Sequence, residues 1–314
     1  MIFLSQPPVL RSLRFAPLLV GLLILGATVR QQRAVLLLEE KFEDDNLKKR
    51  GWYDLADGAL ASFTEKQHAP GSARSVAVKF QKGGTTPVPR VAFRHLFPET
   101  DRVYFSFWVK YSQNWIGSAK QYQPHEFQLL TNVDSEYVGP SRTHLTVYIE
   151  HNFRDGGYGV LGIQDGENID ESLIGADLRT VSENRAVAGC NGSPRGERGD
   201  CYEVDGKHNN GRFWRTPGPV FRDGIGQGTK NDWHKIEAYF QLNTVSGPRA
   251  LYDGIARYWF DGKLIMDRQN VLFRTALFRG MKFRQLIFDP YIGDGSPQDQ
   301  TAWFDDLVVM TGHP

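Results

Sequence analysis

Apolar and polar residues alternate with a period of two along much of this 314-residue chain. The clearest case is the segment 102–111, where valine or phenylalanine occupies every second position from 103 to 109. Segments 75–80, 125–132 and 232–243 show the same pattern. A period of two is that of a strand with one buried face, and no segment has the 3.6-residue period of an amphipathic helix. The pattern predicts an all-β fold of about ten strands.

These strands are expected to form one antiparallel β-sandwich. The 32 glycines and 16 prolines supply turns, and Asp261-Gly262 between two apolar segments predicts a two-residue hairpin. No linker or fixed repeat divides the chain after its first 27 residues. We therefore expect residues 28–314 to be a single β-sandwich domain, with long irregular loops between 152 and 230, where glycine and polar residues dominate.

The first 27 residues have the pattern of an export signal. Arg11 and Arg14 precede an apolar stretch from 15 to 27, which is shorter than the roughly 20 residues needed to span a bilayer. Residues 1–27 are therefore predicted to be a signal peptide or an N-terminal anchor. In both cases the rest of the protein would be secreted, periplasmic or on the cell surface.

The two cysteines, Cys190 and Cys201, bracket a glycine-rich segment. An exported protein meets oxidising conditions, so we expect a disulfide that closes this loop. Two thiols without a nearby histidine pair do not complete a tetrahedral shell, so a metal site is not expected there.

The charge and motif content limit the expected partners. The formal net charge is +1, from 37 Lys and Arg against 36 Asp and Glu, so no global field would attract nucleic acid or anionic membranes. Beyond a possible N-terminal anchor, no membrane contact is expected. No nucleotide-binding loop, haem motif or zinc signature occurs, so no organic cofactor is expected.

The segment 143–151 has the most chemically varied polar face in the chain. Residues 145, 147 and 149 are aliphatic and would face a core. The polar face of 143–151 carries His144, Thr146, Tyr148 and Glu150.

His125 begins the strand predicted at 125–132, where it is interpreted as a residue that only satisfies a turn.

Four segments resemble parts of the concanavalin A-like jelly roll, the fold of legume lectins, laminin-G modules, several glycoside hydrolases and jelly-roll polysaccharide lyases. They are residues 104–111, 233–237, 256–265 and 303–309. In overall style the chain is most similar to secreted polysaccharide lyases. The resemblance implies a jelly-roll β-sandwich that binds a polysaccharide on one sheet face, although the fold alone does not assign a reaction.

A lyase acting on a uronic acid polymer must neutralise a carboxylate, remove the proton beside it and return a proton to the leaving oxygen. Glutamine or arginine suits the first task, and histidine or tyrosine suits the other two. The candidates for catalysis are Gln128, His144, Tyr148, Tyr239 and Arg257, and those for substrate binding are Glu126, Glu150, Glu237, Gln241, Trp108 and Trp259.

Two other functions stay open at this point. A lectin-like or surface structural protein would use the same polar faces, and Trp108 and Trp259, without turnover. A glycoside hydrolase would need two carboxylates that flank one glycosidic bond, and Glu126, Glu150 and Glu237 are the candidates.

The resemblance also implies a structural Ca²⁺ ion. In many carbohydrate-binding jelly rolls an acidic residue after the first strand meets an aspartate of the last strand at such an ion. The matching oxygen donors here are Glu43 or Asp44 with Asp305 or Asp306. Solvated carboxylates at strand ends are the alternative.

Overall fold

The computed structural model describes residues 33–118, 124–131, 145–154, 156–165, 203–204, 207–208, 214–274, 276 and 279–314. Residues 33–314 form one compact unit. No helix in the described ranges is long and apolar enough to cross a membrane. The predicted signal or anchor at 1–27, His144, and the predicted Cys190 and Cys201 disulfide lie outside the described residues, and they stay predictions.

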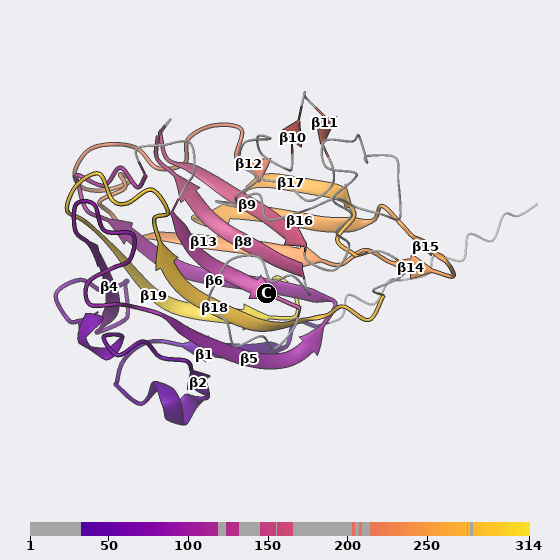
Figure 1. Ribbon diagram of the computed structural model, residues 1–314, viewed down its shortest axis with the longest axis horizontal. Coiled ribbons are helices and arrows are strands. Elements are labelled where there is room, and N and C mark those ends of the chain that lie inside the picture. The colour runs from indigo at the N-terminus through magenta and orange to yellow at the C-terminus, as the bar shows by residue number, and fades with distance from the viewer. Residues whose placement is uncertain are drawn as a thin grey trace, which may run out of the picture. The chain divides into compact units, whose positions relative to one another are not determined.

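Two large antiparallel sheets are stacked into a sandwich (Figure 1). Sheet A has the order β17-β16-β13-β6-β19-β4-β3, and β1 also pairs with β19. Sheet B has the order β12-β9-β8-β7-β18-β5-β2. Neighbours in these orders are mostly distant in sequence, which is the consequence of strands crossing repeatedly from one sheet to the other.

The strands of sheet A are β1 (Leu36–Glu40), β3 (Phe63–Thr64), β4 (Ser75–Phe80), β6 (Arg102–Tyr111), β13 (His234–Gln241), β16 (Gly254–Phe260), β17 (Lys263–Val271) and β19 (Gln300–Met310). Sheet B contains β2 (Trp52–Tyr53), β5 (Phe93–Thr100), β7 (His125–Leu130), β8 (Leu145–Asn152), β9 (Tyr158–Asp165), β12 (Trp214–Arg215) and β18 (Phe283–Tyr291). Two small hairpins pair β10 (Glu203–Val204) with β11 (Lys207–His208), and β14 (Val245–Ser246) with β15 (Arg249–Ala250). The 3-10 turns are η1 (Leu47–Arg50) and η2 (Leu60–Ser62), and Ala276 also has a 3-10 conformation.

Aromatic side chains fill the space between the sheets. Phe127 of sheet B lies with its ring centroid 4.5 Å from that of Phe107 in sheet A and 4.6 Å from that of Phe288 in its own sheet. Phe304 of β19 packs 5.0 Å from Phe288. Each such pair adds about 0.5–1.5 kcal/mol to the energy of burial, so this cluster fixes how the two sheets stack.

The all-β antiparallel sandwich predicted from the sequence is confirmed. The predicted hairpin is also present, because Asp261 and Gly262 join β16 to β17 with φ values of 49° and 74°. Both values are positive, as a turn that follows the twist of its strands requires. Two-residue strands such as β2 and β3 escaped prediction because they are too short to show a period.

Candidate functional site

The residues predicted for the site lie in three places: the outer face of sheet B, the interior between the sheets and the outer face of sheet A. Gln128, Tyr148 and Glu150 lie on the outer face of sheet B, where they alternate with core residues. Glu126 points into the interior between the sheets. On the outer face of sheet A lie Trp108, Glu237, Tyr239, Gln241, Arg257 and Trp259.

The predicted residues on sheet A make their contacts on their own face of the sandwich, away from the residues on sheet B. Tyr239 donates to Oε1 of Gln241 at 2.8 Å and lies opposite Arg257 in the pairing of β13 with β16. Arg257 in turn donates to Asp267 at 3.0 Å. The expectation that Gln128, Tyr239 and Arg257 share one side of the sandwich is therefore wrong, because β7 belongs to one sheet and β13 and β16 to the other.

Glu126 departs from the simple alternation of β7. A period of two would put it on the outer face with Gln128, but its carboxylate accepts hydrogen bonds from Tyr111 and His151 inside the sandwich. The pairing of β7 with β18 shifts register between Phe127 and His125. Glu126 is 3% exposed, so it is not placed to bind a polysaccharide from solution.

His125 lies at the centre of the polar residues on sheet B. Its Nδ1 is 2.5 Å from Oε1 of Glu150, which is fully buried. The rings of Tyr148 and Tyr291 flank the imidazole from β8 and β18, at centroid distances of 5.2 and 6.2 Å. The His125 side chain is 18% exposed and Tyr291 is 36% exposed, so a ligand can reach both.

Charged side chains of β18, of β5 and of the segment before β5 extend this group. Arg90 donates to the Asp289 carboxylate, and Arg90 is 34% exposed whereas Asp289 is 7% exposed. Arg94 is fully buried, donates to Oε1 of Gln285 at 2.9 Å and lies 3.6 Å from Asp54. We name His125 and the five residues around it the His125 cluster: Arg90, His125, Tyr148, Glu150, Asp289 and Tyr291.

Burial sets the electrostatics of this cluster. Burial disfavours a charged His125, but Glu150 and then Asp289 outweigh it and raise the pKa of His125 above 6.5. Burial also raises the pKa of Asp289 to about 6, against the opposing effects of Arg90, His125 and Arg94. The pKa of Tyr148 is raised well above 10 by burial and by Glu150, so its hydroxyl keeps its proton. Perturbed groups gathered in one place mark a candidate functional site.

Two more polar side chains face the same way. Gln128 lies opposite Tyr148 in the pairing of β7 with β8. Thr146, two residues before Tyr148, is buried, and its hydroxyl has no hydrogen-bond partner among the residues that the structure describes. An unsatisfied buried hydroxyl is costly, so it indicates a position where a bound molecule can complete the hydrogen bond.

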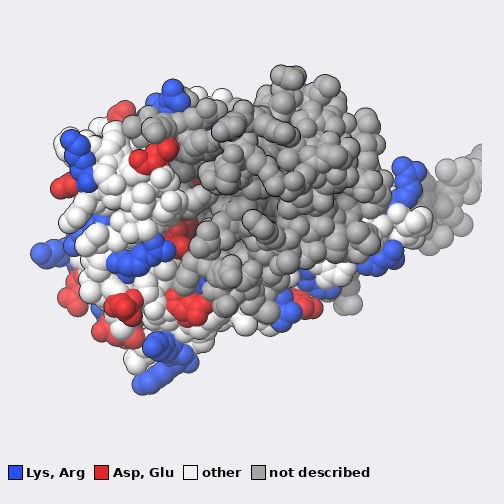
Figure 2. All heavy atoms as spheres, viewed as in Figure 1, with Lys and Arg blue, Asp and Glu red and all other residues white. Residues whose placement is uncertain are grey.

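Charges of both signs occupy the part of the surface around this face that the structure describes. Figure 2 shows basic and acidic side chains interspersed there. Selectivity for an acidic ligand would therefore come from particular cations such as Arg90.

The acidic residues predicted to hold calcium lie near the meeting point of β1 and β19. Glu43 accepts from the hydroxyl of Ser72 at 2.8 Å, and Asp305 accepts from the backbone of Ala69 at 2.8 Å. Asp44 is bound by Arg50 instead. No group of three His, Cys, Asp or Glu side chains that could hold a metal occurs among the described residues. These carboxylates already accept hydrogen bonds from protein donors, which would compete with a Ca²⁺ ion. Calcium binding stays a prediction.

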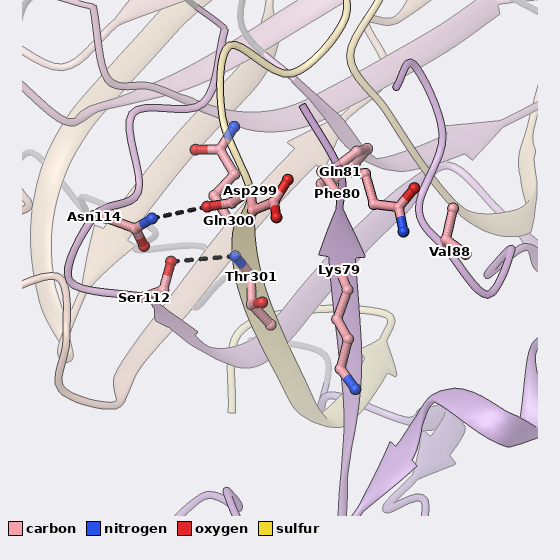
Figure 3. A pocket seen from close by; sticks show the side chains of 9 residues that line it. All are labelled: Lys79, Phe80, Gln81, Val88, Ser112, Asn114, Asp299, Gln300 and Thr301. Carbon is pink, nitrogen blue, oxygen red and sulfur yellow. Dashed lines mark hydrogen bonds between the residues drawn. The ribbon is translucent and has the colours of Figure 1, made fainter. Parts of the chain in front are cut away.

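A separate pocket of 310 Å³ opens between the end of β4 and the start of β19 (Figure 3). Its wall includes Lys79, Ser112 and Asn114, and Asn114 donates to the carbonyl oxygen of Asp299 at 2.7 Å. The described residues of the lining include no histidine or tyrosine. Acid–base chemistry is therefore better supported by the His125 cluster.

Sequence reasoning missed most of the His125 cluster. The sequence pattern indicates only a turn role for His125, and it gives no reason to single out Arg90, Asp289 or Tyr291. Asp289 follows an apolar strand and Arg90 precedes one, so neither stands out by spacing. The one usable signal was that His125 and Glu150 both lie on predicted strands with mixed polar faces.

Comparison with known proteins finds no matching family model and no matching curated protein. Solved structures do match. The marine PL-14 alginate lyase from Aplysia kurodai is 14% identical with a TM-score of 0.54, over 88% of this chain and 100% of that one. An alginate lyase from a Chlorella virus is 14% identical with a TM-score of 0.53, over 88% and 100%. A laminarinase from Flavobacterium is 13% identical with a TM-score of 0.47, over 88% and 99%.

At these identities the likeness shows the fold. The chain has the jelly-roll β-sandwich fold of these alginate lyase structures, as the resemblance of its strands implied. The substrates named for the matching structures are those of the matching proteins.

Proposed function

We propose that the outer face of sheet B binds a uronic-acid-containing polysaccharide and cleaves it by β-elimination. The observation that carries the proposal is the partly exposed His125, held by Glu150 and flanked by two tyrosines. A base oriented by a carboxylate, with hydroxyl donors beside it, is what removal of a weakly acidic proton requires.

His125 is the base in this proposal. Glu150 holds Nδ1, so Nε2 is the nitrogen that accepts the proton beside the substrate carboxylate. The imidazolium that forms is stabilised by the same carboxylate. His144, to which the sequence assigned this chemistry, lies outside the described residues.

A tyrosine returns the proton to the leaving oxygen. Tyr291 lies opposite His125 in the pairing of β18 with β7 and is the more accessible of the two flanking phenols. Tyr148, the residue chosen from the sequence, is fully buried on the other flank. We therefore assign proton donation to Tyr291 and the orientation of His125 to Tyr148.

The substrate carboxylate needs a cation or an amide donor. Arg90 is the accessible cation of the His125 cluster, and its guanidinium donates a hydrogen bond to the Asp289 carboxylate. A guanidinium has five N–H donors, so Arg90 can bind the substrate carboxylate while it keeps its hydrogen bond to Asp289. Gln128 and Thr146 are the neutral donors on the same face.

The placement of three glutamates favours elimination over hydrolysis. Glu126 lies in the interior, Glu150 on the outer face of sheet B, and Glu237 on the outer face of sheet A. Because these three glutamates lie on different faces, they do not support the hydrolase alternative, which needs two carboxylates roughly 5–10 Å apart across one glycosidic bond.

The test is a panel of alginate, glucuronan, pectin and glycosaminoglycans incubated with the protein. We expect at least one polymer to yield an unsaturated uronate, seen by its ultraviolet absorbance, and to lose chain length. Reducing ends without unsaturation would indicate hydrolysis. Binding without any product would support the lectin-like alternative and overturn the lyase proposal.

The Tyr291→Phe and Tyr148→Phe variants separate the two phenols. Tyr291→Phe should lower kcat by about 10²–10³-fold with little change in Tm, since it removes a proton donor at a partly exposed position. Tyr148→Phe should lower kcat less. The reverse order would return proton donation to Tyr148.

A further inference from the structure

Two histidine–glutamate pairs lie back to back on β7 and β8. His125 and Glu150 meet on the outer face of sheet B, with Nδ1 and Oε1 2.5 Å apart. Glu126 and His151, their neighbours in sequence, meet inside the sandwich, with Oε2 and Nδ1 2.8 Å apart. Each strand therefore contributes one acid and one base, and only the outer pair belongs to the site described above.

Two tyrosines of sheet A complete the inner pair. Tyr111 of β6 donates to Oε1 of Glu126 at 2.7 Å, and the hydroxyl of Tyr258 on β16 lies 2.9 Å from Nε2 of His151. When Nδ1 of His151 donates to Glu126, Nε2 can accept from the Tyr258 hydroxyl. All four side chains are 3% exposed or less, so the network is a polar bridge between the sheets.

Neighbouring residues pack closely around the polar bridge. Gly159 lies opposite His151 in the pairing of β8 with β9. A Cβ atom at position 159 would lie 2.5 Å from Cζ of Tyr258, so a larger residue would displace this ring. Phe221 packs edge-on against His151 with ring centroids 5.0 Å apart.

The bridge sits where β7 leaves its regular course. Regular alternation would turn Glu126 outward, but Glu126 and Phe127 both face the interior. The register between β7 and β18 shifts at the same point, and beyond it His125 lies opposite Tyr291. Fixing Glu126 inward therefore fixes the backbone from which His125 projects outward.

Stability alone does not explain four polar side chains in this core. Replacing a buried ion pair by apolar residues of similar volume is often neutral or stabilising. A network with good geometry does, however, impose one arrangement on the groups it joins. Two members of this network, Glu126 and His151, are the sequence neighbours of His125 and Glu150.

We propose that Glu126 and His151, held by Tyr111 and Tyr258, are positioning residues that set the geometry of the outer His125 and Glu150 pair. This inference rests on the proposed function in one respect, since it assigns the benefit to His125 as a base. The network acts through the backbone of β7 and β8, and its own side chains do not touch the substrate.

The test compares two conservative substitutions on one strand. Tyr111→Phe removes the hydroxyl that holds Glu126. Tyr104→Phe is the matched control, because Tyr104 is also on β6 and donates to a buried glutamate, Glu237, at 2.6 Å, but on sheet A. Glu126→Gln is the second variant, and Tyr111→Phe keeps the test usable if Glu126→Gln does not fold.

The first readout is the titration of His125, followed by NMR with labelled histidine. If the network positions His125, the Tyr111→Phe and Glu126→Gln variants weaken its contact with Glu150. Its pKa then moves down toward the ordinary 6.5, whereas Tyr104→Phe leaves it unchanged. An unchanged His125 titration in a folded Tyr111→Phe variant would overturn the proposal.

The second readout uses a polymer that the wild-type protein cleaves. We expect kcat to fall by about 10-fold or more in Tyr111→Phe with KM within about twofold, because a base displaced by a fraction of an ångström loses rate rather than binding. A loss of Tm with kcat and the pH profile intact would make the network structural only. If the wild-type protein cleaves no polymer, the proposed function fails, and the NMR titration still decides the positioning claim.

Discussion

On the outer face of sheet A, Arg257 and Asp267 form an ion pair in which both side chains are partly exposed, whereas each charged pair near His125 on sheet B has one buried member. Arg257 and Asp267 of sheet A keep 31% and 32% of their side-chain surface exposed. Arg94 and Glu150 of sheet B keep none. The residue types are alike on the two faces, and both faces follow the same period of two.

The difference shows that burial, more than residue type, gives a polar face its chemistry. An exposed ion pair is screened by water and contributes about 0–1 kcal/mol. In a buried cluster the same charges shift each other's pKa values, as His125 and Asp289 show. The predictions below test this contrast, starting with the largest expected effect.

The first prediction concerns the base on sheet B. Replacing His125 by glutamine should lower kcat by about 10²–10⁴-fold, because it removes general-base catalysis and keeps a side chain of similar size. Initial rates on a cleaved polymer give the effect, and circular dichroism checks the fold. Retention of more than about a tenth of the activity would contradict the role of His125.

The second prediction is a change in pH dependence. His125 must be neutral to accept a proton, so its raised pKa places the acidic limb of the wild-type rate profile above pH 6.5. Glu150→Gln removes the main cause of that rise, so the limb should move to lower pH, and kcat should fall by roughly 10-fold as the imidazolium loses its partner.

The His125 and Glu150 pair should also make the stability of the fold depend on pH. A histidine with a raised pKa stabilises the fold fully below its unfolded value of 6.5, and this contribution is lost as pH rises through the folded value. Glu150→Gln should therefore lose more stability at pH 5.5 than at pH 8.5. Equal losses at both values would contradict the assigned pair.

The third prediction concerns buried Arg94. Arg94→Met keeps most of the volume but leaves Oε1 of Gln285 buried without its donor, so we expect a loss of about 1–3 kcal/mol in the free energy of unfolding. Urea denaturation measures the loss. A change below about 0.5 kcal/mol would show that the burial of this face contributes little.

The fourth prediction addresses calcium near β1 and β19. If an ion binds Glu43 and the aspartates of β19, removing it with a chelator should lower Tm by roughly 5 °C, and added Ca²⁺ should restore it. An unchanged Tm would leave these carboxylates with only their protein partners, the Ser72 hydroxyl and the Ala69 backbone among them.

The smallest effect is expected on sheet A. Arg257→Met breaks a half-exposed pair with Asp267, so stability should change by about 0–1 kcal/mol and the rate by less than about twofold. Measured beside Arg94→Met, it isolates the contribution of burial. A large loss of activity would restore Arg257 to the catalytic site and remove the contrast between the faces.

Part of the candidate site could be predicted from the sequence. Gln128, Tyr148 and Glu150 were chosen for their residue types on strands with polar faces, and they do share one face. Tyr239 and Arg257 were chosen by the same rule and lie on the other sheet. The rule finds polar faces but does not tell which strands are neighbours, because long crossovers separate neighbours in sequence.

The sequence by itself determined the strands, the Asp261-Gly262 turn and the all-β sandwich, because alternation and turn chemistry are local properties of the chain. Only the tertiary structure decided which polar faces meet. It also turned Glu126 inward and His125 outward, at a register shift that breaks the period of two. That reversal depends on Tyr111 and Tyr258, which reach across from the opposite sheet, and no local pattern in β7 records their presence.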